Sequence, residues 1–486
     1  MVHTASHPRR WTAFAILVAA QFMFVVDAFI ANIAIPSIRA DLHANGAEIE
    51  AVIAIYQIAY ASVLITGGRL GDIFGCKPLF LIGLAGFTAA SAWCGMAPSA
   101  VILIVARAVQ GAAAGLMVPQ VLASVRYLFA TEEHPRAFGI FGIALGLGAA
   151  AGMMLGGWLI TLDPAGLGWR AVFLINIPVG AAAFVAGLAL IPAIRLLVAA
   201  KLDLAGAVLL AAGILPLLGT ILFGRDFDWP AWLAIPAIAG ILFLAAFIRL
   251  ESSRAAQGGS PLLDPAWLRD RGFATGLAAT FTTYIGMTGF LLVLTLLLQD
   301  GLGYSPLDTG LITAPLAFAF LIASRIASRA GAGRGPTVVM TGAAIMAGGL
   351  LLIAAIVTAV SAPSAILLAV PLAVYGFGQG FVLAPLVHVV LARAHRVPAG
   401  AASGVLVTVQ QMAGAIGIAL IGLVYFGIAR TGGDRRAFIV SAILLAVMAL
   451  LAAMVTFRLR RAGAKSSSGI PALSTDRRET RRASGS

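Results

Sequence analysis

Charged residues are scarce in this sequence, and their scarcity sets the class of protein. Only 10% of the 486 residues are Asp, Glu, Lys or Arg, while 61% are hydrophobic. Soluble globular domains carry about 25% charged residues. With so few charges a chain of this length cannot cover its apolar surface, which excludes an ordinary soluble protein. The composition instead predicts a protein whose surface faces lipid.

Cysteine is almost absent, which excludes a disulfide scaffold. Cys76 and Cys94 are the two cysteines, and they stand at opposite ends of one predicted helix. That helix rises about 27 Å between them, whereas the Cα atoms of a disulfide lie within about 7 Å of each other. No Cys or His spacing typical of a metal site occurs. The sequence therefore predicts free thiols, no metal and no other cofactor.

Long apolar segments make up most of the chain. A membrane-spanning helix needs about 20 mostly apolar residues, and in lipid such segments are helical because a helix satisfies its own backbone groups. The sequence predicts fourteen spans, at residues 11–36, 48–68, 78–97, 99–121, 137–161, 171–192, 203–223, 231–250, 272–298, 307–328, 336–360, 364–392, 401–429 and 437–458. Basic residues, which give the net charge of +13, concentrate in alternate loops and both tails. The positive-inside rule places that side, with both termini, in the cytoplasm, and no nucleic acid is needed to explain the charge.

Two pairs of segments repeat each other weakly. VQGAAAGLMVPQVLAS at 109–124 is similar to GQGFVLAPLVHVVLAR at 378–393. A shorter similarity links GRLGDIFGCKP at 68–78 with SRIASRAGAGR at 324–334. Together they suggest two related halves, an organisation that places a substrate site between the halves near the midplane of the bilayer.

Four signatures carry a family resemblance. They are VVDAFIANIAIP, GRLGDIFGCKP, LIVARAVQGAAAG and GAAAGMMLGG, at residues 25–36, 68–78, 103–115 and 148–157. In this order and spacing, the chain resembles the major facilitator superfamily, specifically its fourteen-helix drug:proton antiporter family. It departs from the usual pattern at four positions: Phe29 stands for a Thr, Ile73 and Cys76 for two arginines, and Met153 for a Pro.

The resemblance implies an all-α membrane protein with the major facilitator fold, in which two six-helix bundles flank two extra central helices. The expected divisions are a cytoplasmic N-terminal tail, a first six-helix bundle, a linker region with the two extra helices, a second six-helix bundle and a disordered basic cytoplasmic tail, at residues 1–10, 11–192, 193–271, 272–460 and 461–486. The resemblance also implies alternating access in the plasma membrane, with small lipophilic or monocationic compounds, such as drugs, antibiotics or related metabolites, exported in exchange for protons. We expect a monomer that uses the proton gradient as its energy source.

Asp27 and Arg107 are predicted to be the charged residues deepest within the spans. A charge at that depth costs on the order of 3 kcal/mol, so such residues usually pair and mark a function. Both lie about 12 Å from the outer ends of their helices, so they meet if the two helices are neighbours. Burial and the arginine act in opposite directions on protonation of the carboxylate, which makes the pair a candidate for proton coupling. A structural ion pair that fixes helix register is the alternative.

Polar residues within the spans are candidates for a substrate cavity, because scattered polar groups on apolar walls are typical of ligand sites. The candidates are Asn32, Gln110, Thr283, Tyr284, Gln379, His388 and Gln410. Gln110 lies one helical turn after Arg107 and either contacts substrate or orients that arginine. His388 is either titratable near neutral pH or a packing residue. One embedded acid favours neutral or monocationic substrates over dications.

A short loop after the second span is a candidate conformational latch. Its residues are Gly68, Arg69, Asp72, Gly75 and Lys77, with Arg126 as a candidate partner. The resemblance assigns Asp72 the role of joining the halves through a helix N-terminus and a basic residue. An anion at a helix N-terminus gains about 0.3–1 kcal/mol, and a solvated loop charge is the alternative.

The fourth signature supplies a helix-packing motif of Gly148, Gly152, Gly156 and Gly157. Small residues four apart let another helix approach closely. The motif serves either packing alone or a sliding contact between the halves.

Three other functions fit the sequence less well than drug export. A proton-coupled metabolite carrier of the same fold is the alternative within transport. A membrane-embedded enzyme would need a clustered nucleophile, base or metal ligands, and the histidines are scattered. A channel would need a filter or a ring of charges. No GxxxxGK[ST] loop for nucleotide phosphates occurs, so ATP does not drive the protein directly.

Overall fold

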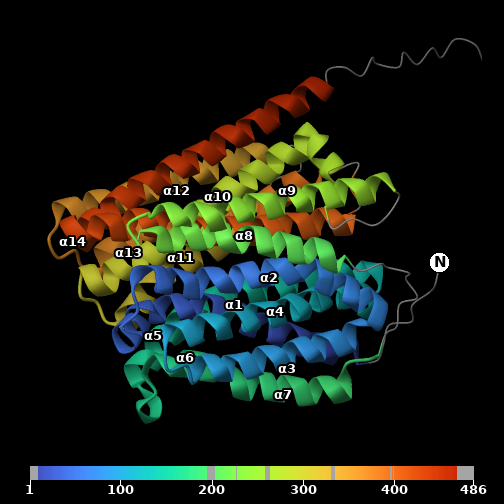
Figure 1. Ribbon diagram of the computed structural model, residues 1–486, viewed down its shortest axis with the longest axis horizontal. Helices are drawn as coiled ribbons and strands as arrows, with labels where there is room; N and C mark the ends of the chain where they lie inside the picture. Colours follow the sequence, from blue (N-terminus) through green and yellow to red (C-terminus); the bar gives the residue numbers. More distant parts are fainter. Residues whose placement is uncertain are drawn as a thin grey trace, which may run out of the picture.

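The computed structural model describes residues 9–193, 203–225, 227–257, 263–329, 334–394, 397 and 399–467 (Figure 1). Its α-helices are α1 (Arg10–Leu42), α2 (Gly46–Phe74), α3 (Cys76–Gly95), α4 (Ala100–Leu128), α5 (His134–Leu162), α6 (Ala171–Leu174), α7 (Asn176–Leu190), α8 (Leu204–Gly224), α9 (Ala234–Ala256), α10 (Arg271–Leu296), α11 (Pro306–Ala327), α12 (Gly335–Ala359), α13 (Ala365–Leu391) and α14 (Ala399–Ser467). A π-helical turn, η6 (Leu297–Gly301), extends α10.

The described helices account for the predicted crossings. Thirteen segments are long and apolar enough to span a membrane, α14 being counted once. The 69 residues of α14 would measure about 104 Å as one straight helix, far more than a bilayer. The helix is interrupted at Gly433, whose φ of 74° and ψ of 166° are not helical. The two limbs of α14 therefore supply the two last predicted spans.

Helix α1 begins and helix α14 ends at the same end of the bundle, on the right of Figure 1. We call the end where α1 begins and α14 ends the terminal face, and the opposite end the far face. Both cysteines are free, as predicted.

The loop predicted after the second span is largely helix, so that boundary was wrong. The apolar stretch ends near residue 68, but α2 continues through Arg69 and Asp72 to Phe74. Only Gly75 separates α2 from α3, with a φ of 94° that suits glycine. Hydropathy misplaced the end because the backbone hydrogen bonds of a helix do not require apolar side chains.

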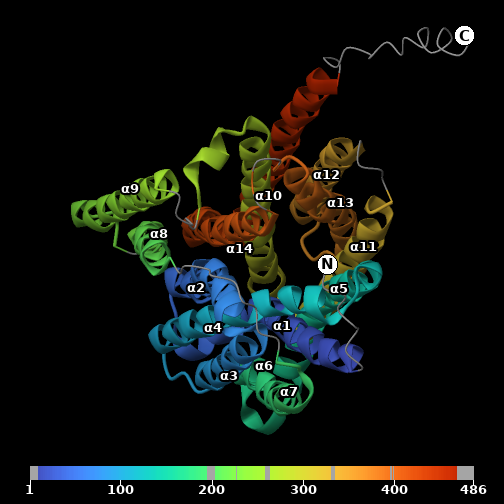
Figure 2. The same ribbon diagram turned by 90° about the vertical axis from the view of Figure 1, so that its right-hand side faces the viewer.

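Figure 2 shows α1–α7 on one side and α10–α14 on the other. Four helix pairs join these halves: α1 packs against α10 and α11, α2 against α14, and α5 against α11. The extra pair, α8 and α9, lies beside this junction, with α8 in contact with both α2 and α14.

The weak sequence repeat corresponds to equivalent packing in the two halves. A Cβ added to Gly111 in α4 would lie 2.3 Å from the carbonyl oxygen of Tyr56 in α2. A Cβ added to Gly380 in α13 would lie 2.5 Å from the carbonyl oxygen of Phe320 in α11. In each half the fourth helix thus crosses the second at a glycine, at the positions that the repeat aligns.

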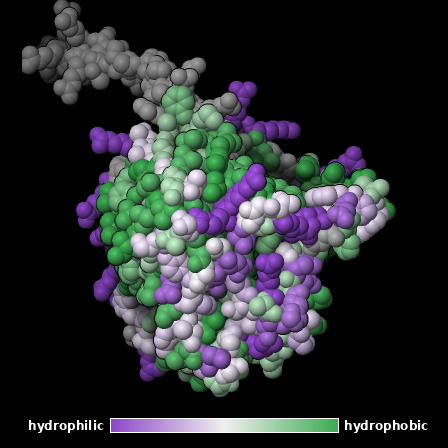
Figure 3. Space-filling model, turned by 90° about the vertical axis from the view of Figure 1, so that its left-hand side faces the viewer, coloured by the Kyte–Doolittle hydropathy of each residue, from purple (hydrophilic) through white to green (hydrophobic). Residues whose placement is uncertain are grey.

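Large apolar side chains cover the outer sides of the helices, as lipid requires. On α9, Ile235 is 70% exposed and Leu242 is 63% exposed. A soluble monomer rarely exposes so many large apolar side chains side by side. Figure 3 shows hydrophilic side chains gathered over the far face instead, where the loops meet water.

A buried ion pair joins the extra helices to both halves near the far face. Arg225, after α8, lies 3.8 Å from the carboxylate of Glu50 in α2, and both are buried. Arg225 also donates a hydrogen bond of 3.3 Å to the carbonyl oxygen of Gly422 in α14. Its guanidinium lies 5.1 Å from the ring centroid of Phe426. One side chain therefore contacts α2 and α14 together.

We expect Arg225→Gln to lower the thermal midpoint of the detergent-purified protein by several degrees. Removing one partner of a buried ion pair costs about 3 kcal/mol, because the other charge stays in a poorly solvated site. The double variant Glu50→Gln/Arg225→Gln removes both charges and should recover most of the loss. A midpoint equal to that of the wild type in the single variant would contradict this account of the junction.

Candidate functional site

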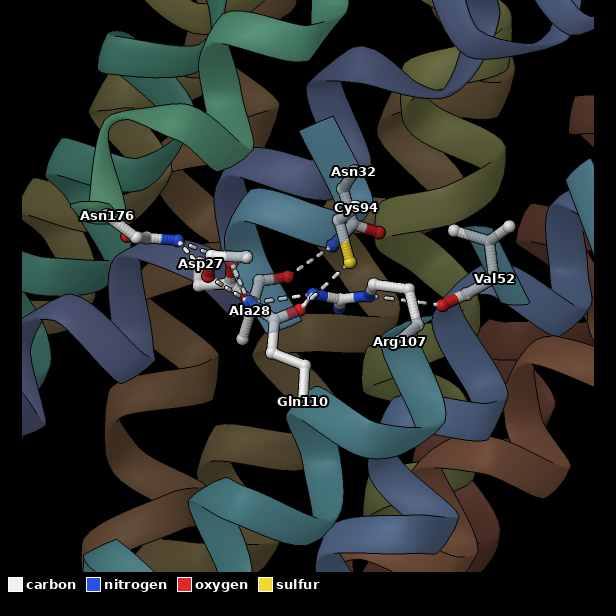
Figure 4. A network of polar contacts seen from close by, with 9 residues as sticks. Asp27, Ala28, Asn32, Val52, Cys94, Arg107, Gln110 and Asn176 are labelled. Atoms are coloured by element: carbon white, nitrogen blue, oxygen red, sulfur yellow. Dashed lines mark hydrogen bonds and ion pairs between the residues drawn. The ribbon is translucent and has the colours of Figure 1, made fainter. Parts of the chain in front are cut away.

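Asp27 and Arg107 form an ion pair in the interior of the first half (Figure 4). The Nη1 atom of Arg107 lies 2.6 Å from Oδ2 of Asp27. Asp27 is 0% exposed and Arg107 is 1% exposed. The predicted pairing of the two helices at this depth is therefore present, since α1 contacts α4.

Gln110 connects both members of the pair. It accepts a hydrogen bond of 2.7 Å from Arg107 and donates one of 2.8 Å to Oδ1 of Asp27. Its position one turn after Arg107 on α4 brings the two side chains to one helix face, as predicted. Because its amide contacts both charges, Gln110 orients the ion pair in this structure.

Sequence reasoning missed two residues that complete the network. Asn176, at the start of α7, donates a hydrogen bond of 2.8 Å to Oδ1 of Asp27. Ser91 of α3 accepts from Gln110 at 2.7 Å and from Asn176 at 3.2 Å. Both are polar residues within apolar spans, which is the sequence feature that could have identified them. The carboxylate of Asp27 thus accepts hydrogen bonds from three side chains on two other helices.

Aromatic rings of α2 and α6 and a backbone carbonyl of α2 hold the guanidinium of Arg107. Its Cζ lies 4.0 Å from the centroid of the Tyr56 ring and 5.6 Å from that of Phe173. Its Nε donates to the carbonyl oxygen of Val52 at 3.4 Å. The close crossing at Gly111 allows this, because it seats α4 against the backbone of Tyr56.

In this geometry, protonation of Asp27 would change the charge balance of the buried pair. Arginine stays charged in proteins, so Asp27 is the member of the pair that can take up a proton. A protonated Asp27 would no longer compensate the charge of Arg107 in this poorly solvated site. The pair is therefore a candidate for linking proton uptake to a conformational change.

The candidate cavity residues are spread over both halves. Asn32 is buried and donates to the carbonyl oxygen of Ala28 on its own helix. Thr283 of α10 is buried, Tyr284, Gln379 and Gln410 are half-buried, and His388 is exposed. A small apolar cavity lies within the second half, between α10, α12, α13 and the second limb of α14, and Thr283 is the candidate that lines it. The structure does not bring the candidates to one site.

Apart from Gly75, which separates α2 from α3, the candidate latch residues belong to helices rather than to a loop. Lys77, in the first turn of α3, donates a hydrogen bond of 2.7 Å to the carbonyl oxygen of Leu188 near the end of α7. That contact lies within the first half. The side chain of Arg126 lies outside the described part of the structure. The latch role of Asp72 stays a prediction.

The glycine motif of α5 uses two faces. A Cβ added to Gly152 would lie 2.8 Å from the carbonyl oxygen of Val26, and Gly148 and Gly156 face α1 in the same way. Gly157 faces the other half instead, where an added Cβ would lie 2.3 Å from the carbonyl oxygen of Pro306 in α11. The stripe therefore packs within the first half, while its last glycine sits between the halves.

Two departures from the family pattern lie together. Met153 forms a buried apolar cluster with Ile33 and Leu291, and Phe29 packs against it. These residues come from α1, α5 and α10, so the cluster lies where the halves meet. The space for Phe29 comes from Gly152, since an added Cβ there would lie 2.9 Å from that of Phe29.

Side chains join the halves at the far face. Gln299, in the π-helical turn η6, donates a hydrogen bond of 3.0 Å to the carbonyl oxygen of Ile33 in α1. The neighbouring Asp300 lies 3.5 Å from Arg39, also of α1. Together with the Gly157 crossing, these contacts hold the halves together at this end.

Comparisons with known proteins agree with this architecture. The family model described as Major Facilitator Superfamily matches residues 17–201 and 204–418. A probable actinorhodin transporter of Streptomyces coelicolor is 36% identical over 87% of this chain and 73% of its own length. A tetracenomycin C resistance and export protein of Streptomyces glaucescens is 31% identical over 85% of this chain and 76% of its own length. A solved structure from work on proton dependent oligopeptide transporters has a TM-score of 0.68 over 94% of this chain and 99% of that chain, at 14% identity.

Proposed function

Because this chain belongs to the Major Facilitator Superfamily, we propose that it exports small lipophilic or monocationic compounds in exchange for protons. It is a multi-pass membrane transporter and not an enzyme. Relatives named for export of or resistance to antibiotics, among them actinorhodin and tetracenomycin C, support the drug class of substrate.

The observation that carries the proton exchange is the buried pair of Asp27 and Arg107. Substrate and proton would exchange if protonated and deprotonated Asp27 favour different arrangements of the halves. A cation entering the interface would favour the deprotonated acid, and proton entry would favour release of the cation. Burial of the ion pair in this structure fits a state in which Asp27 is deprotonated and no proton can reach it from either side.

The apolar side chains where the two halves meet support the proposal of a lipophilic substrate. The cluster of Ile33, Met153, Leu291 and Phe29 gives that interface an apolar character. Alternating access would expose it first to one face and then to the other. We further propose that the terminal face lies in the cytoplasm of a plasma membrane, by the excess of basic residues there, and that the chain works as a monomer.

A proteoliposome assay tests the proposal. The vesicles have an acidic interior, and potassium with valinomycin holds the membrane potential at zero. The permanent monocation ethidium cannot accumulate by its own titration under these conditions. We expect ethidium accumulation that a protonophore abolishes and that protein-free vesicles lack. Accumulation that is indifferent to the pH gradient would remove proton antiport.

A further inference from the structure

An unsatisfied glutamine lies between the halves, at the same level of α2 as the buried ion pair. Gln57 follows Tyr56, whose ring covers Arg107, and one residue turns a helix by about 100°. Gln57 therefore points away from the network. Its side-chain oxygen is shielded from solvent and accepts no hydrogen bond from the described residues.

Gln57 faces the second half, where a threonine hydroxyl approaches the same point. A Cβ added to Gly414 of α14 would lie 2.3 Å from Oε1 of Gln57 and 2.9 Å from Oγ1 of Thr288 in α10. The Thr288 hydroxyl donates to the carbonyl oxygen of Tyr284 at 3.2 Å. Its lone pairs therefore face the junction, and three helices from both halves bring two acceptor oxygens to one place.

Two glycine contacts between α2 and α14 flank Gln57 along the helix. Toward the terminal face, Gly404 of α14 packs against Ile65. Toward the far face, Gly422 packs against Glu50, which is engaged with Arg225. Gln57 lies between these two contacts, near the middle of α2, where a substrate passing between the halves must also lie.

A buried amide oxygen without a donor is costly to keep, and a ligand that donates to it removes the cost. We infer that Gln57 and Thr288 form a recognition point for a hydrogen-bond donor, a hydroxyl or amine, on an otherwise lipophilic substrate. The inference rests on the proposed export function, since it places substrate at the interface that alternating access opens. A permanent positive charge is not needed for this contact.

The position of Gln57 also connects substrate to the ion pair. Val52 and Tyr56 on one side of α2 hold Arg107, and Gln57 on the other side meets substrate. A ligand that pulls on Gln57 therefore acts on the helix that supports the guanidinium. Substrate and proton would be linked through one rigid element without touching each other.

Two anthraquinones that differ only in donor capacity test the inference. 2,6-Dihydroxyanthraquinone has two phenolic donors, and 2,6-dimethoxyanthraquinone has none. Binding to the detergent-purified full chain is measured by fluorescence, at a pH where the phenols are neutral. We expect the wild type to prefer the dihydroxy compound about tenfold, the ratio typical of one hydrogen bond.

Gln57→Met and Thr288→Val should each reduce that preference severalfold while affinity for the dimethoxy compound stays constant. Thr282→Val is the matched control, because Thr282 lies on α10 but lines the cavity within the second half, and it should preserve the preference. Equal weakening of both compounds in the Gln57 variant, or no preference in the wild type, would overturn the inference. Intact donor preference without gradient-driven transport by the wild type would instead overturn the proposed function alone.

Discussion

Asp27→Asn is expected to reduce gradient-driven ethidium accumulation to the level of protein-free vesicles. Asn has nearly the shape of Asp and can keep several contacts, but it cannot carry a proton at any physiological pH. Accumulation against a gradient requires that each export step return a proton. The initial accumulation rate in acid-loaded vesicles is the measurement, and accumulation equal to that of the wild type would remove Asp27 from the mechanism.

Loss of stability is the main competing explanation for such a result. The single variant leaves the guanidinium of Arg107 buried without its carboxylate, which costs about 3–5 kcal/mol. The double variant Asp27→Asn/Arg107→Gln removes both charges and should restore the thermal midpoint without restoring accumulation. If the double variant recovered accumulation as well, the pair would be a structural ion pair and nothing more.

Gly157→Val is expected to reduce transport at least tenfold. An added Cβ would lie 2.3 Å from the carbonyl oxygen of Pro306, and neither backbone can move aside without separating α5 from α11. Overpacking of this kind costs about 1–3 kcal/mol, which corresponds to roughly tenfold or more in an equilibrium. In this case the equilibrium is between closed and open far faces.

The same helix offers a matched control for Gly157. A Cβ added to Gly142 has no atom within 4 Å, so Gly142→Val makes the same chemical change in α5 where there is space. It should transport at the rate of the wild type. Equal losses in the two variants would show that α5 tolerates no valine, and the role of the far-face crossing would be contradicted.

Much of the fold could be predicted from the sequence, because a helix that crosses lipid must be apolar over about 20 residues. The spans follow from apolar length. The pairing of Asp27 with Arg107 followed from their similar depth along two helices that the family resemblance makes neighbours. The repeat at residues 109–124 and 378–393 correctly indicated equivalent fourth helices. The end of α2 was misplaced, since a helix that leaves the apolar region continues until a residue such as Gly75 stops it.

The residues around Asp27 were predicted less completely, because which side chains meet depends on how each helix is rotated about its own axis. Asn176 reaches Asp27, and Ser91 reaches Asn176 and Gln110, only because α7 and α3 turn those faces inward. Gly156 and Gly157 are adjacent in sequence yet face α1 and α11, about 100° apart. In the sequence, Gln57 is only one polar residue within a predicted span. The structure is needed to show that it lies opposite Thr288 and Gly414.

The direct test of the central claim is whether substrate displaces a proton from Asp27. Ethidium is added to weakly buffered, detergent-purified protein, and a pH indicator reports proton release. The account predicts release from the wild type and none from the stable double variant Asp27→Asn/Arg107→Gln, although both bind ethidium. Equal release from the two proteins would contradict it.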